Sequence, residues 1–171
     1  TLVLKINGSK ETFGYHSPLW TGTETYAVED GLEGLTEKET KLASYWNTPF
    51  KKICLGMAVN RETKWIGIDY EASSLISLID DDLHRPTTAG RNVWKSFIER
   101  SSLQPHCNQE GFNIFQRVKI RVGYMTNNEN YCSTSDSCIG FGIDYKSCIR
   151  SNITCGNIAQ CGGNDNGPKL T

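Results

Sequence analysis

The distribution of cysteine is the feature that most constrains this chain. Five of its seven cysteines fall in the last forty residues, among Gly, Asn, Ser and Asp: Cys132, Cys138, Cys148, Cys155 and Cys161. Secreted domains use disulfides in this way to hold loop-rich regions that bury too little apolar surface to be stable alone. We therefore expect a secreted, extracellular protein. Because the number is odd, at least one thiol is free, joins another chain or pairs outside this segment.

Length and composition indicate one polar globular domain over residues 1–171. Hydrophobic residues make up 37% of the chain and charged residues 22%, and the net charge is −1. This balance lacks the basic footprint of a nucleic-acid-binding protein, and no apolar run approaches the ~18 residues of a membrane span. We expect neither nucleic acid binding nor membrane insertion. The chain opens as a strand and closes on a loop, so we expect a processed or partial domain.

Alternating apolar residues predict the main strands. The segment 53–59 reads as a buried strand, and 65–70 reads as its hairpin partner. The clearest pattern lies in 117–125, where apolar residues alternate with Lys119 and Arg121.

Helices are predicted to be few and short. A capping box at 36–39 predicts a helix that runs to about Ala43, and apolar spacing predicts others over 73–79 and 88–100. After Thr126 the regular pattern fades and the cysteine-rich segment begins. The order of elements predicts an α+β fold with little helix and a stapled, loop-rich C-terminal third.

Signatures of catalysis are missing from the sequence. There is no nucleophile elbow or phosphate-binding loop, and the histidines show no zinc spacing with the cysteines. His84 lies in a charged run that we interpret as a solvated loop, and His106 only adjoins Cys107 in sequence. A secreted hydrolase would rest on scattered acids alone: Asp69, Glu71 and Asp80. We expect no catalytic residues and no enzyme activity.

A polar segment near the cysteines is a candidate calcium site. Asn128 and Glu129 are followed by Asp136 and Asp144 in a region rich in amide and carboxylate side chains. Calcium prefers six to eight oxygen ligands of this kind, although the spacing does not match an EF-hand loop. The alternative is a polar loop in which Asn and Asp only form turns.

Aromatic residues can offer flat faces for stacking against sugar rings. The candidates are Trp20, Tyr26, Tyr45, Trp46, Tyr131 and Tyr145, most of which we expect in the core. Tyr131 and Tyr145 flank the polar segment and are the better candidates for ligand binding.

Two sequons are candidate N-glycosylation sites. They begin at Asn7 and Asn152, and both read Asn-x-Ser/Thr. They agree with secretion, and Asn152 is the better candidate because its surroundings read as a surface loop.

Several short motifs resemble the fibrinogen-like domain and, within it, the intelectins (X-type lectins). The shared progression is a strand, Asn-Asn-Glu, two cysteines with five residues between them, Ile-Gly and then Cys-Gly. In this chain it reads 118–121, Asn127-Asn128-Glu129, Cys132 and Cys138, Ile139-Gly140, and Cys155-Gly156. The opening Thr1-Leu2-Val3 follows Gly-Gly-Trp in that family. The resemblance is strongest over 118–157 and diffuse between 10 and 115.

The resemblance implies a disulfide framework. It pairs Cys107 with Cys132, and it pairs Cys155 with a cysteine that precedes the chain in the family. Among the remaining cysteines, Cys138 with Cys148 is the first hypothesis. The resemblance also implies a fibrinogen-like domain that lacks its N-terminal piece and its last strand.

Intelectins hold a calcium ion that binds a vicinal diol of a glycan. The resemblance implies that Glu129 is a ligand, together with residues between the paired cysteines. There the chain departs from the family, because Ser133, Ser135 and Asp136 replace Asn, Glu and His. Asp136 still offers oxygen, so a calcium site of changed composition is implied.

These observations predict a non-catalytic recognition protein that binds a glycan or glycoprotein with the help of calcium. Asn128, Glu129 and Asp136 would hold the ion. The alternative is a structural subunit of an extracellular matrix, filament or disulfide-linked homo-oligomer, in which an unpaired Cys54 or Cys161 joins chains.

Overall fold

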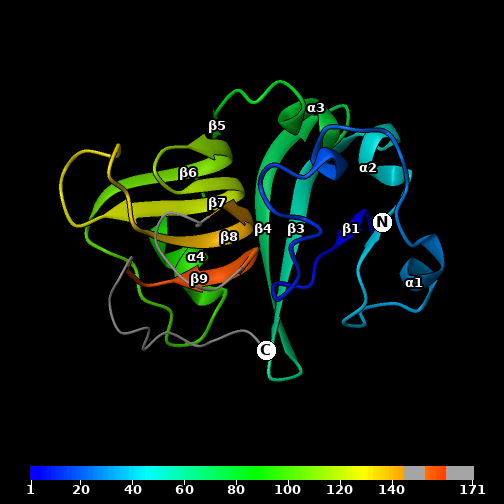
Figure 1. The fold of residues 1–171 in the computed structure, drawn as a ribbon, viewed down its shortest axis with the longest axis horizontal. Helices are drawn as coiled ribbons and strands as arrows, with labels where there is room; N and C mark the ends of the chain where they lie inside the picture. Colours follow the sequence, from blue (N-terminus) through cyan, green and yellow to red (C-terminus); the bar gives the residue numbers. More distant parts are fainter. Residues whose placement is uncertain (145–152, 161–171) are drawn as a thin grey trace.

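The computed structural model describes residues 1–144 and 153–160, which form a mixed α and β fold (Figure 1). The described strands pair antiparallel in one five-stranded sheet and two two-stranded sheets. A long hairpin of β3 (Phe50–Val59) and β4 (Glu62–Ala72) stands between the five-stranded sheet and the N-terminal elements (Figure 1). Strand predominates over helix, as expected.

The five-stranded sheet has the order β5-β6-β7-β8-β9. Its strands are β5 (Arg85–Pro86), β6 (His106–Phe115), β7 (Lys119–Asn127), β8 (Ser137–Asp144) and β9 (Cys155–Ile158). The strand predicted over 117–125 is confirmed as β7, and every residue of β7 after Lys119 is buried. The central strand is therefore covered on both faces.

The prediction that regular structure fades after Thr126 is wrong. Both β8 and β9 lie beyond it, and all of β9 is buried. Glycines hid these strands from the alternation pattern, because they carry no side chain to mark a face. Gly123 and Gly140 stand opposite each other in β7 and β8, and a Cβ on Gly123 would lie 2.5 Å from the Ile139 carbonyl oxygen. The close backbone approach requires glycine there.

The predicted hairpin is confirmed and is longer than its pattern indicated. Asn60 and Arg61 both have positive φ, 52° and 66°, which is typical of a two-residue hairpin turn that matches strand twist. Apolar residues alternate toward the core on one face: Leu55, Met57, Ile66 and Ile68. The opposite face is exposed and carries Cys54 and Trp65.

The N-terminal elements are short. They are β1 (Leu4–Lys5), η1 (Pro18–Trp20), α1 (Val28–Leu32), β2 (Thr40–Lys41) and α2 (Ser44–Asn47). The helix predicted from the capping box at 36–39 is wrong. The box residues have tertiary partners instead: the Thr36 hydroxyl accepts from Lys5 Nζ at 3.0 Å, and Glu39 accepts from the Asn7 backbone N–H at 3.1 Å.

Two further helices agree with the apolar pattern but are shorter than predicted. They are α3 (Ile76–Ile79) and α4 (Arg91–Ser96). Trp94, Phe97 and Ile98 are buried, as their spacing indicated. Gly90 precedes α4 with φ of 90°, a conformation that favours glycine, so the helix begins later than the pattern suggested.

Candidate functional site

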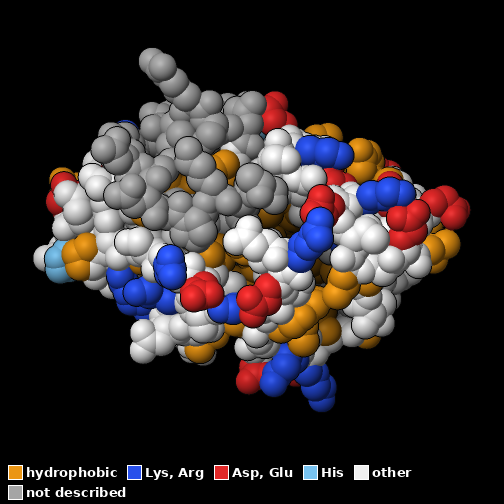
Figure 2. Space-filling model, turned by 90° about the horizontal axis from the view of Figure 1, so that it is seen from below, with side chains coloured by type: hydrophobic (Ala, Val, Ile, Leu, Met, Phe, Trp, Pro, Cys, Tyr) orange, Lys and Arg blue, Asp and Glu red, His pale blue; other side chains and the backbone are white. Residues whose placement is uncertain are grey.

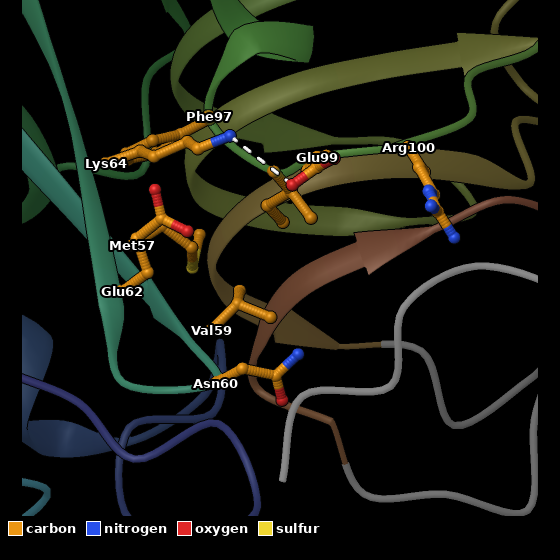
Figure 3. A pocket seen from close by; sticks show the side chains of 9 residues that line it. Met57, Val59, Asn60, Glu62, Lys64, Phe97, Glu99 and Arg100 are labelled. Atoms are coloured by element: carbon orange, nitrogen blue, oxygen red, sulfur yellow. Dashed lines mark ion pairs between the residues drawn. The ribbon is translucent and has the colours of Figure 1, made fainter.

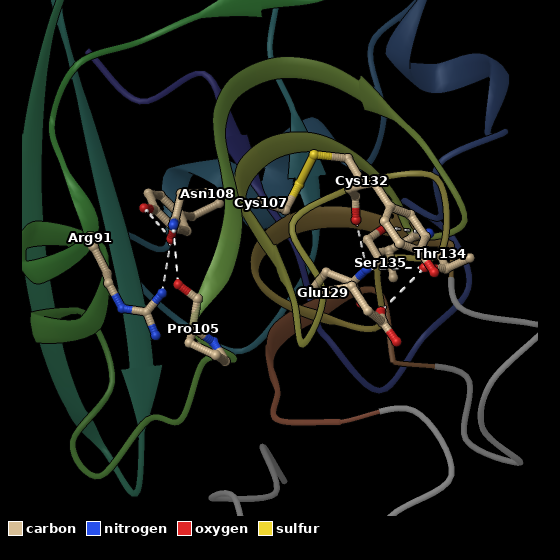
Figure 4. The surroundings of a disulfide bond; sticks show 12 residues. Arg91, Pro105, Cys107, Asn108, Glu129, Cys132, Thr134 and Ser135 are labelled. Atoms are coloured by element: carbon tan, nitrogen blue, oxygen red, sulfur yellow. Dashed lines mark hydrogen bonds between the residues drawn. A yellow bond between two sulfur atoms is a disulfide. The ribbon is translucent and has the colours of Figure 1, made fainter.

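The loop between β7 and β8, residues 128–136, carries most of the predicted metal- and ligand-binding residues. A disulfide between Cys107 and Cys132 ties this loop to β6, with 5.3 Å between the two Cα atoms (Figure 4). It is the pair that the intelectin resemblance implied. The bond closes a segment of 25 residues. In the chain-entropy model such a bond stabilises the fold by about 3.5 kcal/mol.

The β6 end of the disulfide is a bulge. Cys107 and Asn108 have φ of 70° and 51°, and the strand register shifts at this point. The Asn108 Oδ1 accepts from Arg91 Nη1 at 2.9 Å and from the Tyr124 hydroxyl at 3.0 Å, and its Nδ2 donates to the Pro105 carbonyl at 3.2 Å (Figure 4). These hydrogen bonds hold the bulge in place, and the bulge carries the cysteine to which the loop is bonded.

Hydrogen bonds within the loop hold it against the end of β7. Asn127 is fully buried, and its Nδ2 donates to the Tyr131 carbonyl at 2.7 Å and to Thr134 Oγ1 at 3.0 Å. The Ser135 backbone N–H donates to the Cys132 carbonyl at 3.0 Å. Disulfide and hydrogen bonds together give the loop a defined shape, which a coordination site needs.

Two carboxylates share the electrostatic environment of this loop. Glu129 accepts from Asn128 Nδ2 at 3.1 Å and from the Thr134 hydroxyl at 3.5 Å. Desolvation raises the pKa of Asp136, and the charge of Glu129 raises it further, against the opposing effects of Gln104 and Arg117. The charge of Glu129 thus reaches Asp136, and a bound cation would oppose its effect on the Asp136 pKa.

Asp144 does not belong to this site, so the predicted calcium set is only partly brought together. It lies at the other end of β8 from Asp136, about 25 Å away along an extended strand. Its carboxylate contacts His16 at 3.0 Å and Lys119 at 3.8 Å. Across residues 1–144 and 153–160, no group of three His, Cys, Asp or Glu side chains is arranged to hold a metal.

The predicted aromatic candidates divide clearly. Trp20 and Tyr45 are core residues, with exposed fractions of 1% and 0%, whereas Tyr131 on the loop is 56% exposed. Tyr145 lies outside the described residues. Two exposed rings were missed by the sequence reasoning: Trp65 is 53% exposed and Phe115 is 58% exposed. For Trp65 the sequence signal was the hairpin register, which places it opposite Gly56. The pattern along a single strand does not show such a cross-strand pair.

Several other predictions fall partly or wholly outside the described residues. Cys148, Asn152 and Cys161 are among these. Cys138 is a buried thiol that is bonded to no described cysteine. Asn7 is half-buried and accepts from the Ser9 backbone N–H at 3.0 Å and from the Ser9 hydroxyl at 2.7 Å. Its glycosylation remains a prediction.

Two surface acids lie in ion pairs: Asp69, which is one of the three acids on which a hydrolase would rest, and Asp81, which follows another of them, Asp80. Arg85 binds Asp81 through two hydrogen bonds of 2.7 and 2.6 Å, and this pairing lowers the pKa of Asp81 to about 2. Asp69 pairs with Lys52 at 3.1 Å on the outer face of the hairpin. Both contacts are ion pairs at the surface.

A separate small cavity of about 250 Å³ lies between the hairpin tip and the segment that follows α4 (Figure 3). Its apolar side is formed by Met57, Val59, Phe97 and Ile98, and its charged side by Glu62, Lys64, Glu99 and Arg100. Lys64 and Glu99 point toward each other, with 4.0 Å between charged atoms (Figure 3). None of the residues predicted as functional lines it.

Comparisons with family models, curated proteins and solved structures found no match for this chain. No helix in the described part of the chain is long and apolar enough to cross a membrane.

Proposed function

We propose that this protein is a secreted, non-catalytic recognition protein of the fibrinogen-like kind that binds carbohydrate with the help of calcium. The observation that carries the proposal is the β7–β8 loop. The Cys107–Cys132 disulfide anchors it, and it holds Glu129 and Asp136 in one electrostatic environment. The resemblance to intelectins independently points to the same loop.

The loop supplies oxygen atoms of the kind that calcium prefers. Glu129 and Asp136 offer carboxylate oxygens and Asn128 offers an amide oxygen, which is fewer than the six to eight ligands that calcium takes. Two hydroxyls of a sugar would therefore complete the shell. Tyr131, which is 56% exposed on the same loop, would pack on the sugar ring. Asp144 is not part of this proposal because of its distance from the loop.

Calorimetric titration of the oxidised protein with calcium, after EDTA treatment and dialysis, tests the site. We expect about one ion per chain, and we expect Glu129→Gln to lose at least tenfold in affinity. Asp144→Asn is the matched control, since it removes an acid from the far end of β8 and should leave affinity unchanged. Full calcium and glycan binding by Glu129→Gln would overturn the assignment.

A second candidate function is a subunit of a disulfide-linked extracellular assembly. The observation that favours it is Cys54, a free thiol that is exposed on the outer face of the hairpin. Electrophoresis without reductant tests this function. A dimer that collapses on reduction and is lost in Cys54→Ser would support it, and a purely monomeric oxidised protein would exclude this cysteine as the link.

A further inference from the structure

On the outer face of the β3–β4 hairpin, the indole ring of Trp65 packs over Gly56. Trp65 stands opposite Gly56 in the register, and a Cβ on Gly56 would lie 2.6 to 2.9 Å from three atoms of the six-membered part of the indole. The ring therefore lies against the backbone of the neighbouring strand. With 53% of its surface exposed, Trp65 offers its outer side to solvent.

Beyond this ring the same face continues as a strip formed by two cross-strand pairs, Cys54 with Gly67 and Lys52 with Asp69. The adjacent cross-strand pair on the same face is Cys54 with Gly67, and the aliphatic stem of Lys52 lies 3.3 Å from the position of a Gly67 Cβ. Glycine in a strand interior often marks the close approach of another group. Here the two glycines let the Trp65 ring and the Lys52 stem lie close against the backbone of the hairpin.

Polar groups close one end of the strip. Lys52 and Asp69 face each other across the strands and form an ion pair of 3.1 Å, with exposed side-chain fractions of 58% and 84%. Four residues separate Trp65 from Asp69, which corresponds to about 13 Å along the strand. The face thus combines an exposed apolar ring, the aliphatic stem of Lys52, and a paired hydrogen-bond donor and acceptor whose charges cancel.

The size of the face argues against a second copy of the chain as its occupant. Two strands of ten residues present roughly 300 Å², whereas a stable protein interface buries about 800 Å² per partner. Charge bears on a different alternative: the Lys52–Asp69 pair gives the strip no net sign with which to attract an ionic ligand. Positive and negative side chains are likewise interspersed on the surface seen in Figure 2.

We propose that this face is a second carbohydrate site, which takes a short neutral oligosaccharide without calcium. One sugar ring stacks its C–H face on Trp65, the chain continues over Gly67, and hydroxyls of the next unit reach Lys52 and Asp69. For the class of ligand, this inference rests on the carbohydrate-binding function proposed above. For its site and mechanism it is independent of the β7–β8 loop.

The fluorescence of Trp65 provides a direct test. Trp20 and Trp94 are at most 1% exposed and Trp46 is half-buried, so acrylamide quenching reports mainly on Trp65. The oxidised protein is titrated in EDTA with neutral oligosaccharides of glucose, mannose and N-acetylglucosamine. We expect at least one of them to reduce quenching about twofold and to bind in calorimetry.

Three variants separate this site from the loop site. Trp65→Ala should lose at least tenfold in EDTA-resistant affinity, and Gly56→Val should also lose it, because the added side chain displaces the ring. Glu129→Gln should retain it. Phe115→Ala removes another exposed ring, 58% exposed, and is the matched control. Circular dichroism checks that each variant is folded.

Each outcome decides between the proposals. Binding with calcium but not in EDTA, or unchanged EDTA-resistant binding by Trp65→Ala, overturns the Trp65 site and leaves the loop site standing. Binding in EDTA that depends on Trp65 supports it, even if the calcium mechanism fails. No binding in either condition overturns both. Quenching that falls with protein concentration alone shows that a second copy covers the face, and this also overturns the inference.

Discussion

The indole N–H of Trp94 donates a 2.8 Å hydrogen bond to the carboxylate of Glu110, which joins α4 to the five-stranded sheet. The same carboxylate accepts from the Thr87 hydroxyl at 2.7 Å and from the backbone N–H groups of Ala89 and Gly90 at 3.0 and 2.8 Å. One side chain of β6 therefore accepts from four donors. Three of them lie in the segment 87–90, which leads into α4, and the fourth lies in α4 itself. This segment has little regular structure of its own, so its conformation depends on Glu110.

Replacement of Glu110 by alanine should destabilise the protein by about 3 kcal/mol, because partly buried donors lose a charged acceptor and no water replaces it fully. The free energy of unfolding in urea measures the effect. Glu99→Ala is the matched control, since Glu99 is 71% exposed and has a single distant partner at 4.0 Å. Equal stability of the two variants would contradict this role for Glu110.

Arg121 should not tolerate lysine. It is 4% exposed, and its guanidinium donates to the Tyr15 carbonyl at 2.9 Å, to Asn113 Oδ1 at 2.9 Å and to Asp82 Oδ1 at 2.5 Å. A lysine ammonium cannot reproduce this fork of donors. We expect Arg121→Lys to cost about 2–4 kcal/mol in unfolding free energy. Arg117→Lys, on the exposed turn before β7, should change it by less than about 0.5 kcal/mol.

A Cβ at Gly140 should be far more costly than one at Gly67. At Gly140 the added carbon would meet the Val122 carbonyl oxygen and, at 2.8 Å, the Gly123 Cα, both of which are backbone atoms. At Gly67 it would meet only the flexible Lys52 side chain at 3.3 Å. We expect Gly140→Ala to lose about 3 kcal/mol of stability and Gly67→Ala less than about 1 kcal/mol. Thermal denaturation of both variants measures the difference, and similar melting temperatures would contradict the packing described.

The described free thiols should react at very different rates. Cys54 is exposed, whereas burial raises the pKa of Cys155 to about 12 and that of Cys138 still further above its ordinary value. At pH 8 the buried thiols therefore carry almost no thiolate, which is the reactive form. Alkylation of the native protein followed by peptide mapping should label Cys54 at least tenfold faster than the other two. Equal labelling would show that the core opens readily.

The raised pKa of Asp136 predicts an unusual pH dependence. Between the unfolded and the raised folded pKa, the folded protein binds more protons, so this residue favours folding as pH falls through that window and disfavours it at neutral pH. Asp136→Asn should therefore give a small gain in stability at pH 7 that vanishes in acid, while calcium affinity is lost. Thermal melts between pH 3 and 7 measure this, and a loss of stability at pH 7 would contradict it.

Prediction from sequence succeeded where the signal was local. The apolar run over 53–59, the polar turn after it and the return over 65–70 were enough to identify the β3–β4 hairpin, because side-chain pattern and turn chemistry act over neighbouring residues. It failed at the capping box over 36–39, because the Glu39 carboxylate accepts a hydrogen bond from the distant Asn7 backbone N–H and caps no helix. It failed again in β8, where glycine erases the pattern that marks a strand.

The candidate site shows the same division. The residues of the loop at 128–136 were identified from their types and order. Whether they meet was not decided locally: β8 carries Asp144 away from Asp136, and the register of the hairpin leaves Trp65 on an exposed glycine.

By itself the sequence determined the mixed class, the hairpin, the central strand and the chemistry of the β7–β8 loop, since each depends on residues close together in the chain. Only the tertiary structure decided that Arg121 is buried, that β8 and β9 complete the sheet, and that Asp144 lies at the far end of β8 from Asp136. The physical reason is that burial, charge pairing and backbone approach are set by partners distant in sequence. Arg121 takes its contacts from Tyr15 and Asp82, which no local pattern around β7 can specify.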